Sequence, residues 1–76
     1  MRNEFCVTVR KNNINGMITC TAYEDLGDSL GDVVMRNVYD LSSRTQARRT
    51  FVQQLRAYLA NKYNLTTPKI LNLVTN

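Results

Sequence analysis

Two segments near the start of the chain, residues 4–10 and 17–23, alternate strictly between apolar and polar residues. The apolar positions are Phe5, Val7 and Val9 in the first segment and Ile18, Cys20 and Ala22 in the second. A repeat of two residues is typical of a β-strand that buries one face. The pattern therefore predicts two half-buried strands.

An Asn-Gly pair at residues 15–16 separates these two segments. Asn-Gly favours a two-residue type I′ turn, so the pair predicts a β-hairpin in which Ile14 lies opposite Met17. In that register the apolar positions of both strands share one face. Cys6 and Cys20 fall on opposite faces, so we expect no disulfide between them.

Residues 24–39 divide into two segments with different patterns. Residues 24–32 hold two glycines among acidic residues and predict a loop. Residues 33–39 fit two interpretations: their β-branched residues favour a third strand, whereas the spacing of Leu30, Val34 and Val38 also fits one helix face. We expect a strand and keep the helix as the alternative.

A helix is predicted over residues 44–63, which are rich in Ala, Leu, Gln and Arg. Ser43 with Gln46 three residues later forms a capping-box pattern. Asn64 suits a left-handed C-terminal cap, and Pro68 prevents continuation of the helix. At 100° per residue, the apolar side comprises Ala47, Phe51, Val52, Leu55, Tyr58, Leu59 and Tyr63.

A closing strand is predicted over residues 69–74. Seventy-six residues make one domain, and 43% hydrophobic with 21% charged residues is an ordinary globular composition. We therefore expect a single α+β domain over residues 1–76. Its small antiparallel sheet, a hairpin plus one or two further strands, packs on one long amphipathic helix in the order β-β-β-α-β.

Charge divides the chain more sharply than its net value of +4 implies. Asp40 is the last acidic residue, and six basic residues follow it. Residues 24–40 carry five acids and one arginine. Segregated charge bears on partners rather than on fold, and it points to two opposed surface patches.

The outer face of the predicted helix is the first candidate site. Arg49, Gln53 and Arg56 form a stripe at i, i+4 and i+7, with Arg44 near the helix start. We interpret these residues as partner-binding, with an ordinary solvated face as the alternative. A second interpretation is direct nucleic-acid binding, because arginine and lysine contact phosphates. That set comprises Arg44, Arg48, Arg49, Arg56 and Lys62.

The acidic loop is the second candidate, through Asp25, Asp28 and Asp32. We interpret these aspartates as partner-binding, with an ordinary solvated loop as the alternative. Their spacing does not match an EF-hand, so we expect no metal site. A surface with opposed charges can also pair with itself, which leaves a homodimer or a self-assembling structural subunit open.

The polar face of the hairpin is the third candidate. One helix covers only one face of a sheet, so the other face stays exposed unless a partner covers it. Its residues are Thr8, Arg10, Thr19, Thr21 and Tyr23. They form either an ordinary exposed strand surface or a platform on which a base could stack.

The sequence gives little support for a catalytic function or a bound cofactor. The chain has no histidine, the commonest general base. Neither cysteine belongs to a CxxC pair, and no glycine-rich phosphate loop is present. We expect a protein that is not an enzyme and has no cofactor.

These features favour a small non-enzymatic binding module, an adaptor or inhibitor that occludes a macromolecular surface. Such compactness is typical of small proteins encoded by bacteriophages and mobile elements, and the partner could be a nucleic-acid-handling complex. We expect a protein partner, with nucleic acid as the alternative. We expect no membrane span, and the two cysteines without a targeting segment favour the cytoplasm.

Overall fold

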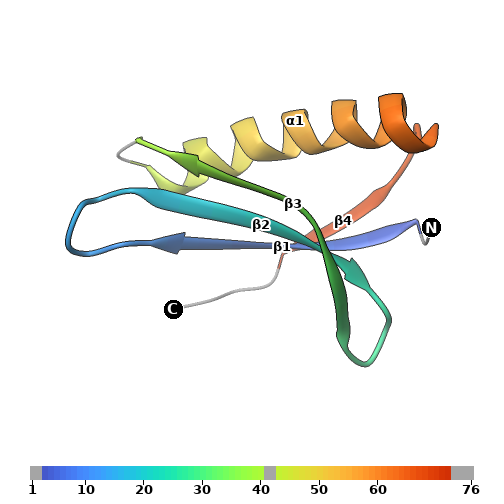
Figure 1. Ribbon diagram of the computed structural model, residues 1–76, viewed down its shortest axis with the longest axis horizontal. Helices are drawn as coiled ribbons and strands as arrows, with labels where there is room; N and C mark the ends of the chain where they lie inside the picture. Colours follow the sequence, from blue (N-terminus) through green and yellow to red (C-terminus); the bar gives the residue numbers. More distant parts are fainter. Residues whose placement is uncertain (1–2, 41–42, 73–76) are drawn as a thin grey trace.

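The computed structural model describes residues 3–40 and 43–72 and has the predicted α+β fold (Figure 1). Within these residues, four strands form one sheet and a single helix packs on it. In chain order the elements are β1 (Glu4–Lys11), β2 (Ile18–Asp25), β3 (Leu30–Tyr39), α1 (Arg44–Tyr63) and β4 (Lys69–Asn72). The predicted order β-β-β-α-β is confirmed.

The sheet has the strand order β3-β2-β1-β4, so the first hairpin lies at its centre. β1, β2 and β3 are antiparallel neighbours, as expected for a meander. β4 pairs with β1 in parallel, which makes the whole sheet mixed. Alternation along a single strand carries no information about the direction of the neighbouring strand. The sequence therefore could not distinguish parallel from antiparallel pairing of the last strand. The last two residues of the predicted strand 69–74 lie outside the described residues.

The first hairpin is confirmed, but the predicted turn is wrong. Lys11 pairs with Ile18, and residues 12–17 form a longer loop in place of the two-residue type I′ turn. Asn12 and Asn15 each accept a hydrogen bond from the backbone N–H two residues ahead, at 2.8 and 2.9 Å. These side-chain bonds and Gly16, at φ 73°, close the loop.

The pairing of Ile14 with Met17 is therefore wrong as well, and the register differs by two residues from the prediction. Because side chains alternate with a period of two, a shift of two keeps every residue on its predicted face. Cys6 and Cys20 thus still lie on opposite faces, and both are free thiols.

Residues 33–39 belong to a strand, so the helix interpretation is wrong for them. β3 also begins earlier than expected, at Leu30, and β2 runs on to Asp25. The predicted loop over residues 24–32 is correspondingly a tight connection, closed by a bond from Leu26 N to Ser29 O of 3.0 Å. Two register irregularities in the β2–β3 pair lie next to this connection.

The helix has the predicted bounds and both predicted ends. The Ser43 side chain accepts a bond from the Gln46 backbone N–H at 3.2 Å. Asn64 adopts the left-handed conformation, at φ 57°, and Leu65 N donates to Leu59 O at 3.1 Å. Leu65 also packs against the core. Both ends are specified locally, by residues at or next to the termini.

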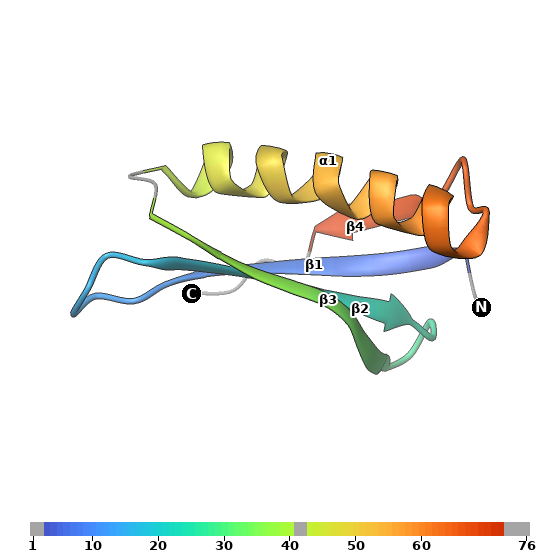
Figure 2. The same cartoon turned by 45° about the horizontal axis from the view of Figure 1, so that its top comes forward.

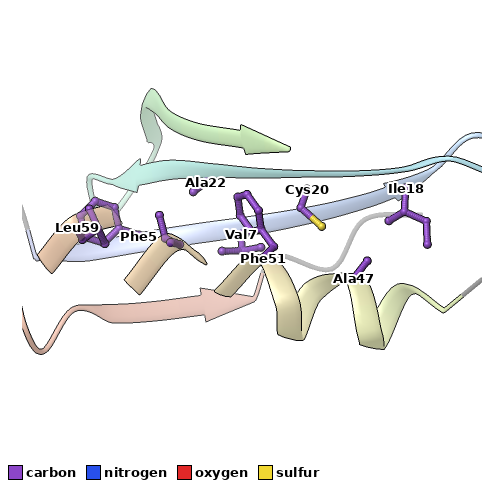
Figure 3. Close-up of a cluster of buried hydrophobic side chains, with 9 residues drawn as sticks. Phe5, Val7, Ile18, Cys20, Ala22, Ala47, Phe51 and Leu59 are labelled. Carbon is purple, nitrogen blue, oxygen red and sulfur yellow. The ribbon is translucent and has the colours of Figure 1, made fainter. Parts of the chain in front are cut away.

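The core lies between α1 and one face of the sheet (Figure 3). The helix contributes Ala47, Phe51, Leu55 and Leu59, spaced by four residues. The strands contribute Phe5, Val7, Ile18, Cys20 and Ala22. Val52 and Tyr58 are partly buried as expected, whereas Tyr63 was predicted on the apolar side and is exposed. Tyr63 lies in the last turn, beyond the last buried helix residue, Leu59.

The molecule has two layers and measures 36 × 27 × 16 Å. Figure 2 shows α1 lying along one face of the sheet. No helix or strand within residues 3–40 and 43–72 covers the other face. Within the same residues, no helix combines the length and apolar character that a membrane span needs.

Candidate binding surfaces

The predicted helix stripe lies on the side of α1 that faces away from the sheet. Arg49, Gln53 and Arg56 are exposed, and so is Arg44 at the helix start. Their exposure follows from the four-residue spacing of the buried side chains, which turns these positions outward. Among the described residues, none of the three arginines has a hydrogen bond or ion pair. The stripe is available to a partner.

Two other basic residues of the helix already have partners within the molecule. The Nε of Arg48 donates to Oδ1 of Asn72, which ties α1 to β4. Lys62 donates to the Tyr58 hydroxyl at 3.1 Å and lies over the rings of Tyr58 and Tyr63, 5.4 and 5.5 Å from their centroids. The predicted nucleic-acid-binding set included both Arg48 and Lys62. Three arginines of that set, Arg44, Arg49 and Arg56, are left without a partner in the described part of the chain.

The lysine–tyrosine cluster shifts two ionisations in opposite directions. The hydrogen bond from Lys62 lowers the pKa of Tyr58, because it stabilises the tyrosinate. The same bond, with the charge of the tyrosinate, raises the pKa of Lys62. The Tyr58 hydroxyl and the Lys62 ammonium both lie in solvent, so this pair contributes a local electrostatic feature and little stability.

The three aspartates of the acidic segment have different roles. Asp25 is buried at the end of β2, where Oδ1 accepts from Gly27 N at 2.9 Å and Oδ2 accepts from the Cys6 thiol at 3.8 Å. It shapes the β2–β3 connection from within. Asp28 and Asp32 are exposed and remain candidates for partner contact.

The acidic connection and the basic helix lie apart. Figures 1 and 2 both show the β2–β3 connection curving away from α1, on the other side of the sheet. The surface is therefore dipolar. Among the described residues, no group of three Cys, Asp or Glu side chains could hold a metal ion.

Both thiols have a raised pKa. Burial is the main cause for Cys6, reinforced by the negative charge and hydrogen bond of Asp25. Burial also raises the pKa of Cys20, and the charge of Arg48 opposes that shift. A catalytic thiolate needs the opposite shift, so neither position has the environment of a nucleophile.

No helix or strand of the described residues covers the second face of the sheet, which we call the open face, although Cys6, Thr8 and Thr21 in its middle are themselves buried. Register arranges its side chains in rows across the strands: Arg10, Thr19 and Val38; then Thr8, Thr21 and Arg36; then Leu71, Cys6, Tyr23 and Val33. Val33, Val38 and Leu71 are 55%, 48% and 37% exposed. One end of this face is thus cationic, the middle carries threonines and the other end is largely apolar.

A concavity of about 360 Å³ lies at the cationic end of the open face. Its described lining comprises Arg10, Lys11, Asn12, Thr19 and Arg36, with no carboxylate among them. The Nε of Arg36 donates to the Thr21 hydroxyl at 3.5 Å, which holds its guanidinium beside β2. Two strands that flank β2 therefore bring their arginines to one hollow.

Sequence reasoning found part of this face and missed the rest. It placed Thr8, Arg10, Thr19, Thr21 and Tyr23 together, because they belong to one hairpin. The residues missed were Arg36, Val33, Val38 and Leu71, whose position depends on how β3 and β4 pair. Alternation in β3 could have indicated a face, but its irregular register breaks that signal.

A polar cluster between β3 and α1 was also missed. The Asn37 side-chain amide donates to Oε1 of Gln54 at 3.0 Å and to the Tyr39 hydroxyl at 3.2 Å. The Tyr39 hydroxyl itself donates to Gln54. Burial raises the pKa of Tyr39, against the lowering effect of the Asn37 bond. This cluster joins the edge strand to the helix and is structural.

Comparison of the chain with protein-family models, with curated proteins and with solved structures finds no match.

Proposed function

We propose that this chain is a small non-enzymatic binding module that works by covering a surface of a protein partner. The observation that carries the proposal is the open face of the sheet, where Val33, Val38 and Leu71 are exposed. A two-layer protein has no internal use for apolar side chains on that face. A partner that buries these three side chains removes their apolar surface from water, which stabilises the complex.

Size supports the sheet as the main contact. The four described strands have 8, 8, 10 and 4 residues and, at the usual strand spacing and rise, span a face of about 500 Å² in projection. The outer side of the 20-residue helix spans only about 300 Å². A standard interface buries about 800 Å² on each partner, so the sheet face with its margins comes closer to that size.

The charged residues then have a secondary role in the proposal. The exposed Asp28 and Asp32 lie near the β2–β3 connection, at one end of the open face, whereas the Arg44, Arg49, Gln53 and Arg56 stripe lies on the opposite side of the molecule. Charges outside a contact contribute to the field of the whole protein, which raises association rates and orients partners more than it raises affinity. We propose that they steer an oppositely patterned partner onto the sheet, and that the module acts in a reducing compartment, which its two free thiols favour.

Direct nucleic-acid binding by α1 is the weaker candidate. Arg48 and Lys62 have intramolecular partners, which leaves Arg44, Arg49 and Arg56 spread along a convex surface. An enzymatic function is weaker still, because the raised pKa of both thiols favours their protonated form.

Capture from lysate tests the proposal, with tagged protein and with nuclease treatment of every sample. The test variant is Val33→Asp with Leu71→Asp, which puts a charge at each end of one apolar row. The matched control, Thr45→Asp with Thr66→Asp, adds the same charge at exposed positions outside the sheet. We expect a specific polypeptide to be captured by the wild type and the control and lost with the test variant.

Two results would contradict the proposal. Capture that nuclease abolishes would indicate that the partner is nucleic acid. Equal capture by the two double variants, with unchanged melting temperatures, would show that the open face is not the contact.

A further inference from the structure

The cationic end of the open face has a composition that protein binding does not explain. Arg10 and Arg36 are both exposed and lie on the two strands that flank β2. Two guanidinium groups that line one concavity repel each other, which costs free energy. Neither arginine has an ion pair among the described residues to offset that cost.

The geometry brings the two guanidinium groups toward one place. Arg10 lies opposite Thr19, and Arg36 lies opposite Thr21 in the adjacent row of the same face. Two strand spacings across and one row along put their Cα atoms about 12 Å apart. That gap is within the combined reach of two arginine side chains, and both line the same concavity.

The donors in this concavity are suited to an anion. A guanidinium binds a phosphate through paired N–H donors, and the hydroxyl of Thr19 can donate from the floor between the arginines. The Thr21 hydroxyl accepts from Nε of Arg36 and leaves its terminal amino groups to face the ligand. The Lys11 side chain belongs by alternation to the helix side of β1, so the cations on the open face are the two arginines.

The acidic residues near the β2–β3 connection lie far enough from the concavity to leave it favourable for an anion. The exposed Asp28 lies in the β2–β3 connection and Asp32 near the start of β3, and Figure 1 shows this connection and the β1–β2 turn at opposite ends of the sheet. The concavity lies beside the β1–β2 turn, since Lys11 and Asn12 line it. A volume of about 360 Å³ falls within the range of small-ligand sites, so it accommodates a phosphate with the group attached to it.

We propose that Arg10 and Arg36, with Thr19 between them, form a phosphate-binding site on the open face of the sheet. The phosphate comes from a single-stranded nucleic acid or from a free phosphate or nucleotide, since these share the chemistry that the donors recognise. The site does not depend on a protein partner, because the apolar row of Leu71, Tyr23 and Val33 is separate from it.

Amide NMR titration tests this site with two probes, inorganic phosphate and a short oligothymidylate, at low salt. We expect the largest shifts at the amides of Arg10, Thr19 and Arg36. Shifts with both probes at similar phosphate concentration indicate a free phosphate or nucleotide as the ligand. Shifts with the oligothymidylate alone indicate a phosphodiester chain, and added salt then weakens that binding.

Matched variants distinguish phosphate binding at this site from nonspecific attraction of phosphate to a positively charged protein. Arg10→Gln with Arg36→Gln should weaken binding about tenfold or more, because it removes charge-assisted bonds. Arg49→Gln with Arg56→Gln removes the same charge from the helix and should leave the shifts in place. Thr19→Val keeps every charge and should weaken binding about two- to tenfold.

The proposal is overturned if neither probe shifts these amides, or if the helix pair weakens binding as much as the sheet pair. It is also overturned if Thr19→Val and Arg10→Gln with Arg36→Gln both bind like the wild type. Val33→Asp with Leu71→Asp should retain phosphate binding, so loss of the protein partner and loss of the phosphate site remain distinguishable.

Discussion

Two pairs of arginines on opposite sides of the molecule have the same chemistry and nearly the same spacing. Arg49 and Arg56 are seven residues apart on α1, or about 10 Å along the helix axis. Arg10 and Arg36 are separated by about 12 Å across the sheet. The second pair lines a concavity, together with a hydroxyl and an amide side chain.

The difference between the pairs is in curvature and neighbours. A helix is convex, so side chains along its outer face diverge into solvent, where salt screens their charges. On the sheet, arginines of two strands line one concavity, and the Thr21 hydroxyl accepts a hydrogen bond from one of the guanidinium groups. Cation density along a sequence is therefore a poor guide to an anion site, whereas convergence in the fold is a better one.

The largest expected effect would remove both surfaces together. Phe51 is fully buried between α1 and the sheet (Figure 3). Phe51→Ala should lower the free energy of unfolding by about 3–5 kcal/mol, through lost burial and the cavity left behind. A domain of this size has a total stability of about 4–11 kcal/mol, so the variant should be partly unfolded at moderate temperature.

Urea denaturation measures this change, and Tyr63→Ala is the control. It removes an aromatic ring of similar size from an exposed position, where its neighbours are Tyr58 and Lys62. A loss for Tyr63→Ala as large as that for Phe51→Ala would mean that the core is not where the structure has it. Phosphate shifts and protein capture should both fail in Phe51→Ala, because one core supports both surfaces.

The parts of the fold that the sequence predicted correctly are the parts that neighbouring residues determine. Ser43, Gln46 and Asn64 act within a few residues of the helix ends, and both ends are where they were expected. The first turn was missed for a similarly local reason. The side chains of Asn12 and Asn15 bond the backbone and outweigh the preference of Asn-Gly for a shorter turn.

The parts of the candidate site that the sequence missed depend on pairing between distant segments. Arg36 joins Arg10 only because β3 and β1 both flank β2. Leu71 reaches the open face only because β4 pairs in parallel with β1, opposite Cys6. No pattern within residues 30–39 or 69–72 specifies those neighbours. The helix stripe, by contrast, was placed correctly because it needs only the period of one helix.

A smaller change should affect the helix and leave the sheet unchanged. Ser43→Ala removes the cap on the Gln46 amide and should cost about 1 kcal/mol of stability. The first turn carries Arg44, so the helix stripe should loosen at that end. Hydrogen exchange at the Gln46 amide should accelerate, while phosphate binding at Arg10 and Arg36 should persist.

Thr45→Ala provides the comparison for this cap. Thr45 is exposed in the first turn of the helix and has no bond within the described part of the chain, and alanine favours helix. It should leave the Gln46 exchange rate unchanged or slower. If both variants accelerate exchange equally, the Ser43 side chain does not act as the cap.

The smallest expected effect belongs to the far end of the helix, at Lys62 and Tyr58. Because the pKa of Tyr58 is lowered in the folded chain, its ionised form favours folding, so this contribution appears only as pH rises through the tyrosine range. The raised pKa of Lys62 keeps the ammonium charged across that window, and the contribution is lost when pH passes the lysine pKa. Tyrosinate absorbance should therefore show one of the four tyrosines ionising early. Lys62→Met should abolish that early step, whereas Lys69→Met, on β4, should keep it. An early step that survives Lys62→Met would assign the shift to another tyrosine and would leave the end of the helix as plain solvated surface.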